Sequence, residues 1–326
     1  MTLDETLMAR AVAVGETARL DAPPNPWVGA LVVVDGVVVA EGATQAPGRN
    51  HAEVEALGRA GDAARGATLV VTLEPCDHVG RTGACTQAIL DAGIARVVVG
   101  VVDPDPQVAG RGVARLRAAG VDVEVGAGSQ LVREQLAAYL WHRRTGRPYV
   151  VAKVAATLDG VVAMADGTSQ WITGEAARAD AHELRARSQA IVVGAATVRS
   201  DDPRLTARVG ARVLEPLRVV LGRAPQDARV RPCLEYEGDL ADLLDDLGAR
   251  GVLQVLVEGG ATTTSAFLET GLVNRFAWYV APAWAGGTNT RSALAALSTT
   301  TMGALRRGRV VGVARIGEDV RLDVEV

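Results

Sequence analysis

The stretch ATLVVTLEPCDHVGRTGAC, residues 67–85, decides the fold of the first half of the chain. Its apolar part, 67–73, has the length and composition of a buried strand, and Pro75-Cys76 follows soon after. A glycine-containing loop then leads to Cys85, which opens the helical pattern CTQAILDAGI. The chain has only 3 cysteines, and two of them flank this loop. A disulfide, a metal site, a nucleophile and simple packing are all open at this point.

Strand and helix patterns alternate on both sides of this stretch. Before it, residues 30–42 predict two short strands around an Asp-Gly turn, and residues 51–61 predict a helix that ends at a glycine. After it, residues 96–106 predict another buried strand. Such alternation is typical of an α/β fold with a largely parallel sheet.

The length of 326 residues favours two domains of about 150 residues each. The segment WHRRTGRPYV, residues 141–150, is polar and basic, contains a Gly-Arg-Pro break and is the best candidate for a linker. We therefore expect a first domain over 1–146 and a second over 147–326. The second half reads as another α/β series, and no internal repeat relates the halves.

Composition argues against several classes of protein. The formal net charge is −4 and no basic patch stands out, which disfavours a nucleic-acid-binding protein. No stretch of about 18 apolar residues predicts a membrane helix, and the N-terminus lacks the basic flank of a signal peptide. An odd number of cysteines disfavours a disulfide framework. We expect a cytoplasmic protein that acts on small molecules, without nucleic-acid or membrane partners.

Four residues together match the H-x-E…P-C…C pattern of zinc-dependent nucleobase deaminases: His51, Glu53, Cys76 and Cys85. One imidazole and two thiolates would hold Zn²⁺ and leave a fourth position for water, whose pKa the ion lowers toward about 7. Glu53, in the first turn of the same helix as His51, would carry protons from that water to the ring nitrogen and the leaving ammonia. Each piece alone is common, but the joint pattern favours a catalytic zinc site over buried structural cysteines.

The spacing of the cysteines departs from the common C-x-x-C. Eight residues, 77–84, lie between them. This insertion is expected to form a loop that shapes or gates the pocket, with His78 and Arg81 as possible substrate contacts. A zinc-bound His78 is the rival interpretation, although three protein ligands already complete a catalytic site. Cys233 lies far from either motif and is expected to take no part.

The segment VLVEGGATTTSAFL, residues 255–268, predicts a strand, a Gly-Gly turn and a helix opened by threonines. Main-chain N–H groups at such a helix start can bind phosphate, although the segment is not a G-x-G-x-x-G fingerprint. A tight turn with threonine caps explains it equally well. Lys153 is the only lysine in an arginine-rich chain. Either coding bias has left a single lysine, or Lys153 lies in a site where the planar guanidinium group of arginine does not fit.

Several specific motifs extend over nearly the whole chain: NPWVGALVV, HAEVEAL, TLEPCDHVGRTGAC, DPDPQVAGRG, KVAATLDG, SQWITG, LRARSQAIVVGAATVRSDDPRLTAR and VEGGATTTSAFL. With them the chain resembles the bifunctional deaminase/reductase family of riboflavin biosynthesis. The resemblance implies a cytidine-deaminase-like three-layer α/β/α domain, followed by a dihydrofolate-reductase-like α/β domain. The first would deaminate a phosphoribosylaminopyrimidine with zinc, and the second would reduce its ribosyl side chain to ribityl with NADPH.

The resemblance also implies roles for individual residues. The zinc ligands would be His51, Cys76 and Cys85, and Glu53 would be the proton shuttle. The pyrimidine would contact Asn25. The NADPH contacts would be Ala155, Trp171, Thr197, Asp201, Gly260, Ala261, Thr262, Thr263 and Thr264. The substrate contacts of the second domain would be Ser169, Arg185, Leu205, Arg208 and Glu258.

Lys153 and Asp201 would be the catalytic residues of the second domain. The Lys153 ammonium would orient the substrate or supply a proton, and Asp201 would balance its charge. Two positions depart from the family pattern: Thr44 replaces a frequent histidine, and Asp105 replaces an asparagine. Both departures leave the zinc set intact and concern local substrate contacts only.

Two other functions remain open. One is a deaminase for another nucleobase with a non-catalytic second domain, which the acidic charge and the phosphate-binding turn disfavour. The other is a binding module with a structural zinc ion, which would need no proton shuttle at Glu53. Because this pair of folds often assembles through the reductase half, we also expect a homodimer.

Overall fold

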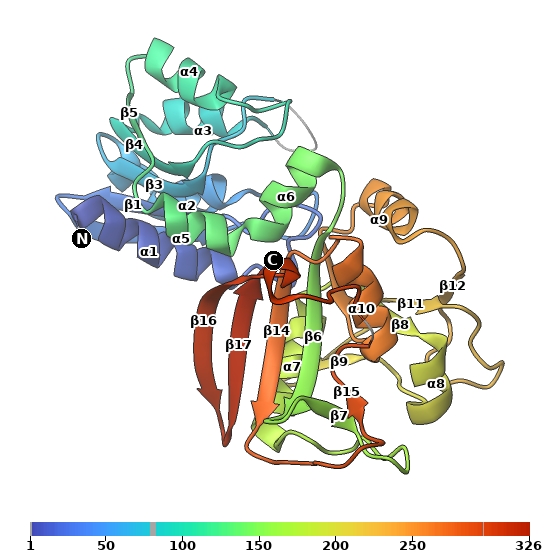
Figure 1. Cartoon of the computed structure of the whole chain (residues 1–326). Helices are drawn as coiled ribbons and strands as arrows, with labels where there is room; N and C mark the ends of the chain where they lie inside the picture. The colour runs from blue at the N-terminus through green and yellow to red at the C-terminus, as the bar shows by residue number, and fades with distance from the viewer. Residues whose placement is uncertain (1, 79–82, 296) are drawn as a thin grey trace. The chain divides into compact units, whose positions relative to one another are not determined.

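The computed structural model describes residues 2–78, 83–295 and 297–326. Contacts divide the chain into two compact units, Met1–Gly146 and Arg147–Val326. Each unit is built around its own β-sheet with helices packed against it (Figure 1). The α/β fold expected for both halves is confirmed. Within the described ranges, no helix combines the length and the apolar composition that crossing a membrane requires.

The first unit contains a five-stranded sheet in the order β2-β1-β3-β4-β5. Its strands are β1 (Gly29–Val34), β2 (Val37–Ala43), β3 (Thr68–Leu73), β4 (Arg96–Val101) and β5 (Asp122–Val125). The last three are parallel, whereas β1 runs antiparallel to both β2 and β3. Asp35 and Gly36 join β1 to β2 with φ values of 49° and 78°, which suits the predicted Asp-Gly hairpin.

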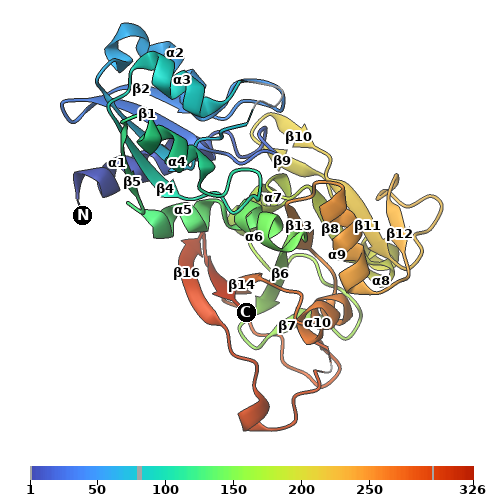
Figure 2. The ribbon, with the colours of Figure 1, turned by 90° about the horizontal axis from the view of Figure 1, so that it is seen from above.

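Helices cover both faces of this sheet, which gives three layers. On one face α1 (Leu3–Glu16) contacts α5 (Ser129–Gln135); on the other, α2 (Ala52–Ala60), α3 (Cys85–Ala92) and α4 (Arg111–Ala118) follow one another (Figures 1 and 2). The central strands are buried almost throughout, because both of their faces lie under helices. A further helix, α6 (Ala137–Thr145), completes the unit.

The segment 141–150, expected to be a linker, is mostly regular structure. Residues 141–145 form the end of α6, and the next strand begins at Tyr149. The basic residues Arg143 and Arg144 lie in the last helical turn, where positive charge interacts favourably with the helix dipole. Gly146, with a φ of 76°, then ends the helix. The boundary between the two compact units, after Gly146, lies within this segment.

The second unit contains an eight-stranded sheet in the order β12-β11-β8-β13-β6-β14-β17-β16. Its strands are β6 (Tyr149–Thr157), β8 (Ala190–Gly194), β11 (Leu217–Leu221), β12 (Leu234–Tyr236), β13 (Gln254–Val257), β14 (Arg275–Ala281), β16 (Arg309–Ile316) and β17 (Asp319–Glu325). The six from β12 to β14 are parallel, and β17 and β16 extend the sheet antiparallel. Two small sheets pair β9 (Ala207–Val209) with β10 (Arg212–Leu214) and β7 (Val161–Ala163) with β15 (Arg291–Ser292).

The central strand β6 presents two different faces, because side chains alternate along a strand. Ala152 and Val154 face a hydrophobic core that includes α9 (Leu240–Ala249) and α10 (Ala261–Glu269). Lys153 points to the opposite face, where α7 (Glu175–Ala186) packs (Figure 1). The shorter helix α8 (Ala195–Asp201) follows β8 directly. The sheet therefore buries an apolar core under α9 and α10, and Lys153 lies on the face that α7 covers.

Candidate active sites

The three expected zinc ligands come together just beyond the end of strand β3. Cys76 follows the carboxyl end of that strand, His51 caps the start of α2, and Cys85 is the first residue of α3. Their ligand atoms all lie within 4.8 Å of one another. The N–H group of Cys85 also approaches Cys76 Sγ at 3.5 Å. The start of α3 therefore stabilises negative charge on that sulfur.

The distances within this group fit a tetrahedral zinc ion. His51 Nδ1 lies 3.6 Å from Cys76 Sγ and 3.3 Å from Cys85 Sγ. Zinc bonds of about 2.3 Å to sulfur and about 2.1 Å to nitrogen place such ligand atoms roughly 3.6 Å apart. One imidazole and two thiols also leave a fourth position open, as a catalytic zinc site requires. The residues present therefore fit the predicted metal.

The two thiols carry charge unequally. A hydrogen bond from the Cys85 thiol, assisted by His51, lowers the pKa of Cys76 to about 4 despite burial. The same contact with Cys76, together with burial, raises the pKa of Cys85. Without a metal ion, the two thiols therefore favour a single negative charge, on Cys76. Binding of a metal ion favours deprotonation of Cys85 as well.

Glu53 lies in the first turn of α2 and is only 4% exposed. Burial, followed by the negative charge at Cys76, raises the pKa of its carboxyl group to about 7. A group with such a pKa can both accept and donate a proton near neutral pH. Among the described residues, the metal-binding group includes neither Glu53 nor His78. Arg81, the other residue considered in the insertion, lies outside the described residues.

The two departures from the family pattern have partners of their own. Thr44 is buried and pairs with Val28, whose N–H group donates to the Thr44 hydroxyl at 3.1 Å. Asp105 accepts from the N–H group of Gln107 at 2.9 Å and pairs with Arg143 at 3.4 Å. Both side chains therefore stabilise the loops that carry them. The predicted pyrimidine contact, Asn25, is half-buried in the turn before β1.

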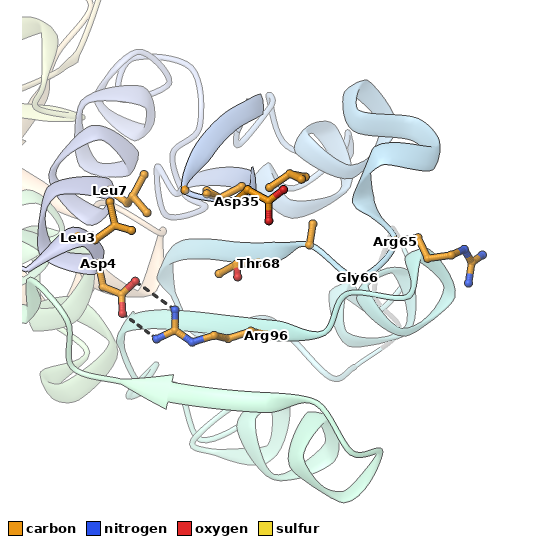
Figure 3. Close-up of a pocket in the computed structure, with 12 residues that line it drawn as sticks. Leu3, Asp4, Leu7, Asp35, Arg65, Gly66, Thr68 and Arg96 are labelled. Carbon is orange, nitrogen blue, oxygen red and sulfur yellow. Dashed lines mark hydrogen bonds and ion pairs between the residues drawn. The ribbon is translucent and has the colours of Figure 1, made fainter.

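A cavity of about 340 Å³ lies at the opposite end of the same sheet (Figure 3). The start of α1, the β1–β2 turn and the residues leading into β3 and β4 line it. Arg96 binds both carboxylate oxygens of Asp4 there, at 3.1 and 2.7 Å (Figure 3). It also donates to Glu124. None of the predicted site residues lines this cavity, and its central arginine is already paired. We therefore assign no ligand to it.

In the second unit, Lys153 lies within a polar cluster under α7. Glu258 directly follows β13, and the parallel register of Val257 with Ala152 places Glu258 next to Lys153 in the sheet. Arg185 of α7 binds both carboxylate oxygens of Glu258, at 2.6 and 2.7 Å. Three of the predicted residues therefore meet at one place, although they lie far apart in the sequence.

The charges in this cluster support one another. Burial lowers the pKa of Lys153, and the negative charge of Glu258 opposes that effect. Burial acts to raise the pKa of Glu258, but the Arg185 guanidinium outweighs it and holds this pKa below its ordinary value. Glu258 is therefore the carboxylate that stabilises the ammonium group. Asp201, predicted for this role, is exposed near the end of α8 and stays a prediction.

The aromatic ring of Tyr279, on β14, packs beside Lys153. Lys153 Nζ lies 5.9 Å from the centre of the Tyr279 ring. The Tyr279 hydroxyl donates to Asp180 of α7 at 2.5 Å, and Arg321 of β17 donates to the same carboxylate at 2.8 Å. The ring is only 1% exposed, so its position is fixed by packing as well as by these bonds.

Two helix starts lie on neighbouring parallel strands of the second sheet. Helix α8 follows β8, and α10 follows β13. The N–H group of Gly260 donates to Thr197 Oγ1 at 3.3 Å, which ties the two starts together. Free N–H groups at helix starts favour phosphate, so this arrangement suits the phosphates of NADPH.

A side chain at Gly259 is expected to disturb this turn. A Cβ atom added at Gly259 would lie 2.3 Å from Thr263 Cβ, which is closer than two non-bonded carbon atoms can approach. We expect Gly259→Ala to shift the start of α10 and to weaken NADPH binding about tenfold, measured by quenching of tryptophan fluorescence. Gly303→Ala, where the added Cβ meets nothing within 4 Å, is the matched control. Equal NADPH affinity in both variants would contradict the expected role of this turn.

The remaining predicted residues differ in exposure. Trp171 is 70% exposed, and Arg208 is exposed with its guanidinium 2.9 Å from His182 Nε2. Leu205 is buried with a φ of 53°, which is rare for a branched side chain and marks a constrained loop. Buried or half-buried positions are held by Ala155, Ser169, Thr197, Ala261, Thr263 and Thr264, and exposed ones by Gly260 and Thr262.

Comparison with known families decides the identity. Residues 148–322 match the model of the RibD C-terminal domain, and residues 1–101 match the cytidine and deoxycytidylate deaminase zinc-binding region. The chain belongs to the RibD family. It is 45% identical over 316 residues to riboflavin biosynthesis protein RibD of Chlamydia trachomatis, covering 86% of this chain and 84% of the relative.

Solved RibD structures have the same fold over the whole chain. RibD of Acinetobacter baumannii (form 1) superposes with a TM-score of 0.92 at 37% identity, covering 99% of this chain and 98% of that one. A Thermotoga maritima protein, named as a diaminohydroxyphosphoribosylaminopyrimidine deaminase/5-amino-6-(5-phosphoribosylamino)uracil reductase, has a TM-score of 0.87 at 33% identity with the same coverage. This RibD protein is a bifunctional deaminase and reductase of riboflavin biosynthesis, with zinc and NADPH as its cofactors.

The RibD motifs did not reveal every residue of these sites. Tyr279 and Asp180 lie in an ordinary strand and an ordinary helix, and their contact depends on tertiary structure alone. Glu74 was also missed. It is only 4% exposed, and its carboxylate accepts from the N–H groups of Asp103, Gly110 and Val113 at 2.9 to 3.2 Å. The sequence places Glu74 between a buried strand and Pro75-Cys76. A carboxylate at such a position is expected to be buried and therefore to need hydrogen-bond donors, which was the signal that could have identified it.

Proposed function

We propose that the first unit hydrolyses the amino group of 2,5-diamino-6-(phosphoribosylamino)pyrimidin-4-one, giving the corresponding uracil and ammonia. The zinc ion, held by His51, Cys76 and Cys85, would lower the pKa of a water molecule toward about 7. Glu53 would accept a proton from the attacking water and pass protons to the ring nitrogen and the leaving amine. Asn25 would contact the pyrimidine. The burial of Glu53 beside the ligand group supports this assignment.

We propose that the second unit then reduces the ring-opened imine form of the ribosyl side chain to ribityl, with a hydride from NADPH. Lys153 would orient the sugar or supply the proton, and Glu258 would hold the ammonium charged. Because the Arg185 fork is occupied by Glu258, Arg208 is the better candidate for the substrate phosphate. Ser169 and Leu205 would complete the substrate site. NADPH would be held by Ala155, Trp171, Thr197, Asp201 and residues 260–264.

The observation that carries the proposal is the zinc-shaped ligand group with a buried carboxylate beside it, in a chain that matches RibD over both units. The test is an assay of the purified protein with the pyrimidine substrate, following ammonia release and NADPH oxidation. We expect ammonia without NADPH present, and NADPH oxidation only after ammonia release. Ammonia from another nucleobase but not from this pyrimidine would contradict the proposed substrate. Metal analysis of the same sample would test the zinc.

We propose that the enzyme acts in the cytoplasm as a homodimer that forms through the reductase half, and that it binds no nucleic acid. Strand β16 supports the dimer, since it is the last strand of its sheet and exposes Val310 (57%) and Val313 (67%). An edge strand with exposed apolar side chains favours association with a second copy.

We expect Val313→Lys to shift the protein from dimer to monomer, because a buried lysine at the interface would lose its hydration. Light scattering after size-exclusion chromatography would measure the mass. Val213→Lys, at a position that is 63% exposed on β10, is the matched control. A dimeric Val313→Lys protein would place the interface elsewhere.

A further inference from the structure

The residues that directly follow the two zinc-binding cysteines bind each other. Asp77 follows Cys76 and Thr86 follows Cys85, and the Thr86 hydroxyl donates to Asp77 Oδ1 at 2.6 Å. The main chain closes at the same place, because the N–H group of Thr86 donates to the carbonyl of Cys76 at 3.1 Å. Thr86 has no exposed surface, so its hydroxyl is aimed at Asp77 within the protein.

Arg115, in the last turn of α4, contacts both sides of this closure. One guanidinium nitrogen donates to Asp77 Oδ1 at 2.5 Å, and another donates to Gln87 Oε1 of α3 at 2.5 Å. It therefore links the segment after the first cysteine to the helix that the second cysteine opens. We call Asp77, Thr86 and Arg115 the cysteine clasp.

The cysteine clasp compensates for the long insertion between the two cysteines. In a C-x-x-C pattern one tight turn fixes both sulfur atoms, but here the eight residues 77–84 separate them. A longer connection leaves more conformations in which the two sulfurs are apart, and closing it costs more entropy. Hydrogen bonds across the base of the insertion, directly beside both ligands, remove those conformations before a metal ion binds.

We propose that Asp77, Thr86 and Arg115 are positioning residues that hold Cys76 and Cys85 at zinc-binding distance across the insertion. The proposal rests on the zinc site assigned above to His51, Cys76 and Cys85. None of the three clasp residues belongs to the metal-binding group itself. Loss of residues that orient metal ligands typically weakens metal binding 10- to 100-fold.

The test compares two threonine variants. Thr86→Val keeps the shape of the side chain and removes the hydroxyl that donates to Asp77. We expect its zinc Kd, measured by competition with a chromophoric chelator, to rise at least about tenfold. Thr72→Val is the matched control, since it removes an equally buried hydroxyl on β3 that accepts from the N–H group of Gly29 at 3.2 Å. The control should lose thermal stability while keeping its zinc Kd.

A spectroscopic measurement shows whether the sulfur geometry itself changes. With Co²⁺ in place of zinc, the thiolate charge-transfer and d–d bands report the arrangement of the two sulfurs. We expect Thr86→Val and Arg115→Gln to shift these bands and Thr72→Val to leave them unchanged. Arg115 is 37% exposed, so its variant should fold even if Thr86→Val does not.

A double-mutant cycle completes the test. Asp77→Ala and Thr86→Val should be non-additive in zinc Kd, because either change breaks the same contact. A zinc Kd within twofold of wild type in Thr86→Val and Arg115→Gln would overturn the proposal and leave the clasp as ordinary packing. Failure of the wild-type protein to bind zinc more tightly than His51→Ala would instead overturn the zinc site, and the clasp with it.

Discussion

Glu53→Gln is expected to lower the rate of ammonia release about 1,000-fold while zinc content stays unchanged. The amide has almost the shape of the carboxyl group but cannot accept and return a proton. The carboxyl group is not among the metal ligands, so the ligand set remains complete. Ammonia release and zinc content would be measured on the same sample. Reduction of supplied deaminated intermediate should continue at the wild-type rate, since the residues proposed for the reduction lie in the other unit.

Glu55→Gln is the matched control for this variant. Glu55 lies on the same helix with a partly exposed side chain, which accepts from Asn50 at 2.9 Å and pairs with Arg59 at 3.6 Å. Surface contacts of this kind contribute little to stability, so its deamination rate should match wild type. Deamination by Glu53→Gln within about tenfold of wild type would rule out the assigned proton shuttle.

Lys153→Met is expected to lower reductase turnover at least about 100-fold and to leave deamination intact. Methionine fills a similar volume without charge, so the loss reports the ammonium group rather than a cavity. Lys153→Arg should not restore turnover, because the planar guanidinium is larger and binds in a different geometry. NADPH oxidation with supplied deaminated intermediate is the measurement, with NADPH affinity determined separately.

Arg275→Met is the control for removing a partly buried cation from this sheet. Arg275 lies on the adjacent strand β14, 6.0 Å from the Tyr149 ring centre, and pairs with Glu325 at 3.0 Å. Its loss should lower thermal stability with little effect on reductase turnover. If the two variants lose turnover equally, the effect is structural and Lys153 has no role in the chemistry.

The three zinc ligands could be predicted from the sequence because each one stands at the end of a strand or the start of a helix. Cys76 follows a strand end, and His51 and Cys85 stand at helix starts. Apolar runs and glycines mark such positions in the sequence, so the fold class and the ligand group could be predicted together. The clasp could not be predicted, because the contact of Arg115 with Asp77 joins a helix and a loop that only the folded sheet brings together.

The residues of the proposed reductase site could be predicted only in part from the sequence, for the same reason. Lys153 and Glu258 were both singled out by motif, but their adjacency depends on the parallel register of β6 and β13, which no local pattern fixes. The sequence suggested Asp201 as the charge partner of Lys153, which stays a prediction, and the structure adds Glu258 as a negative charge acting on Lys153. Tyr279 gave no signal at all, since a tyrosine in a buried strand is ordinary core composition.

The single lysine also has a consequence for chemical labelling. An amine-directed acylating reagent finds only one ε-amino group in this chain, and that group lies beside Glu258 and Tyr279 in the proposed reductase site. Because burial lowers the pKa of Lys153, a larger share of it is in the neutral, nucleophilic form than for an exposed lysine at the same pH. Acylation mapped to the peptide that contains Lys153, and so kept apart from reaction at the N-terminal α-amino group, would therefore count proposed reductase sites that hold no ligand.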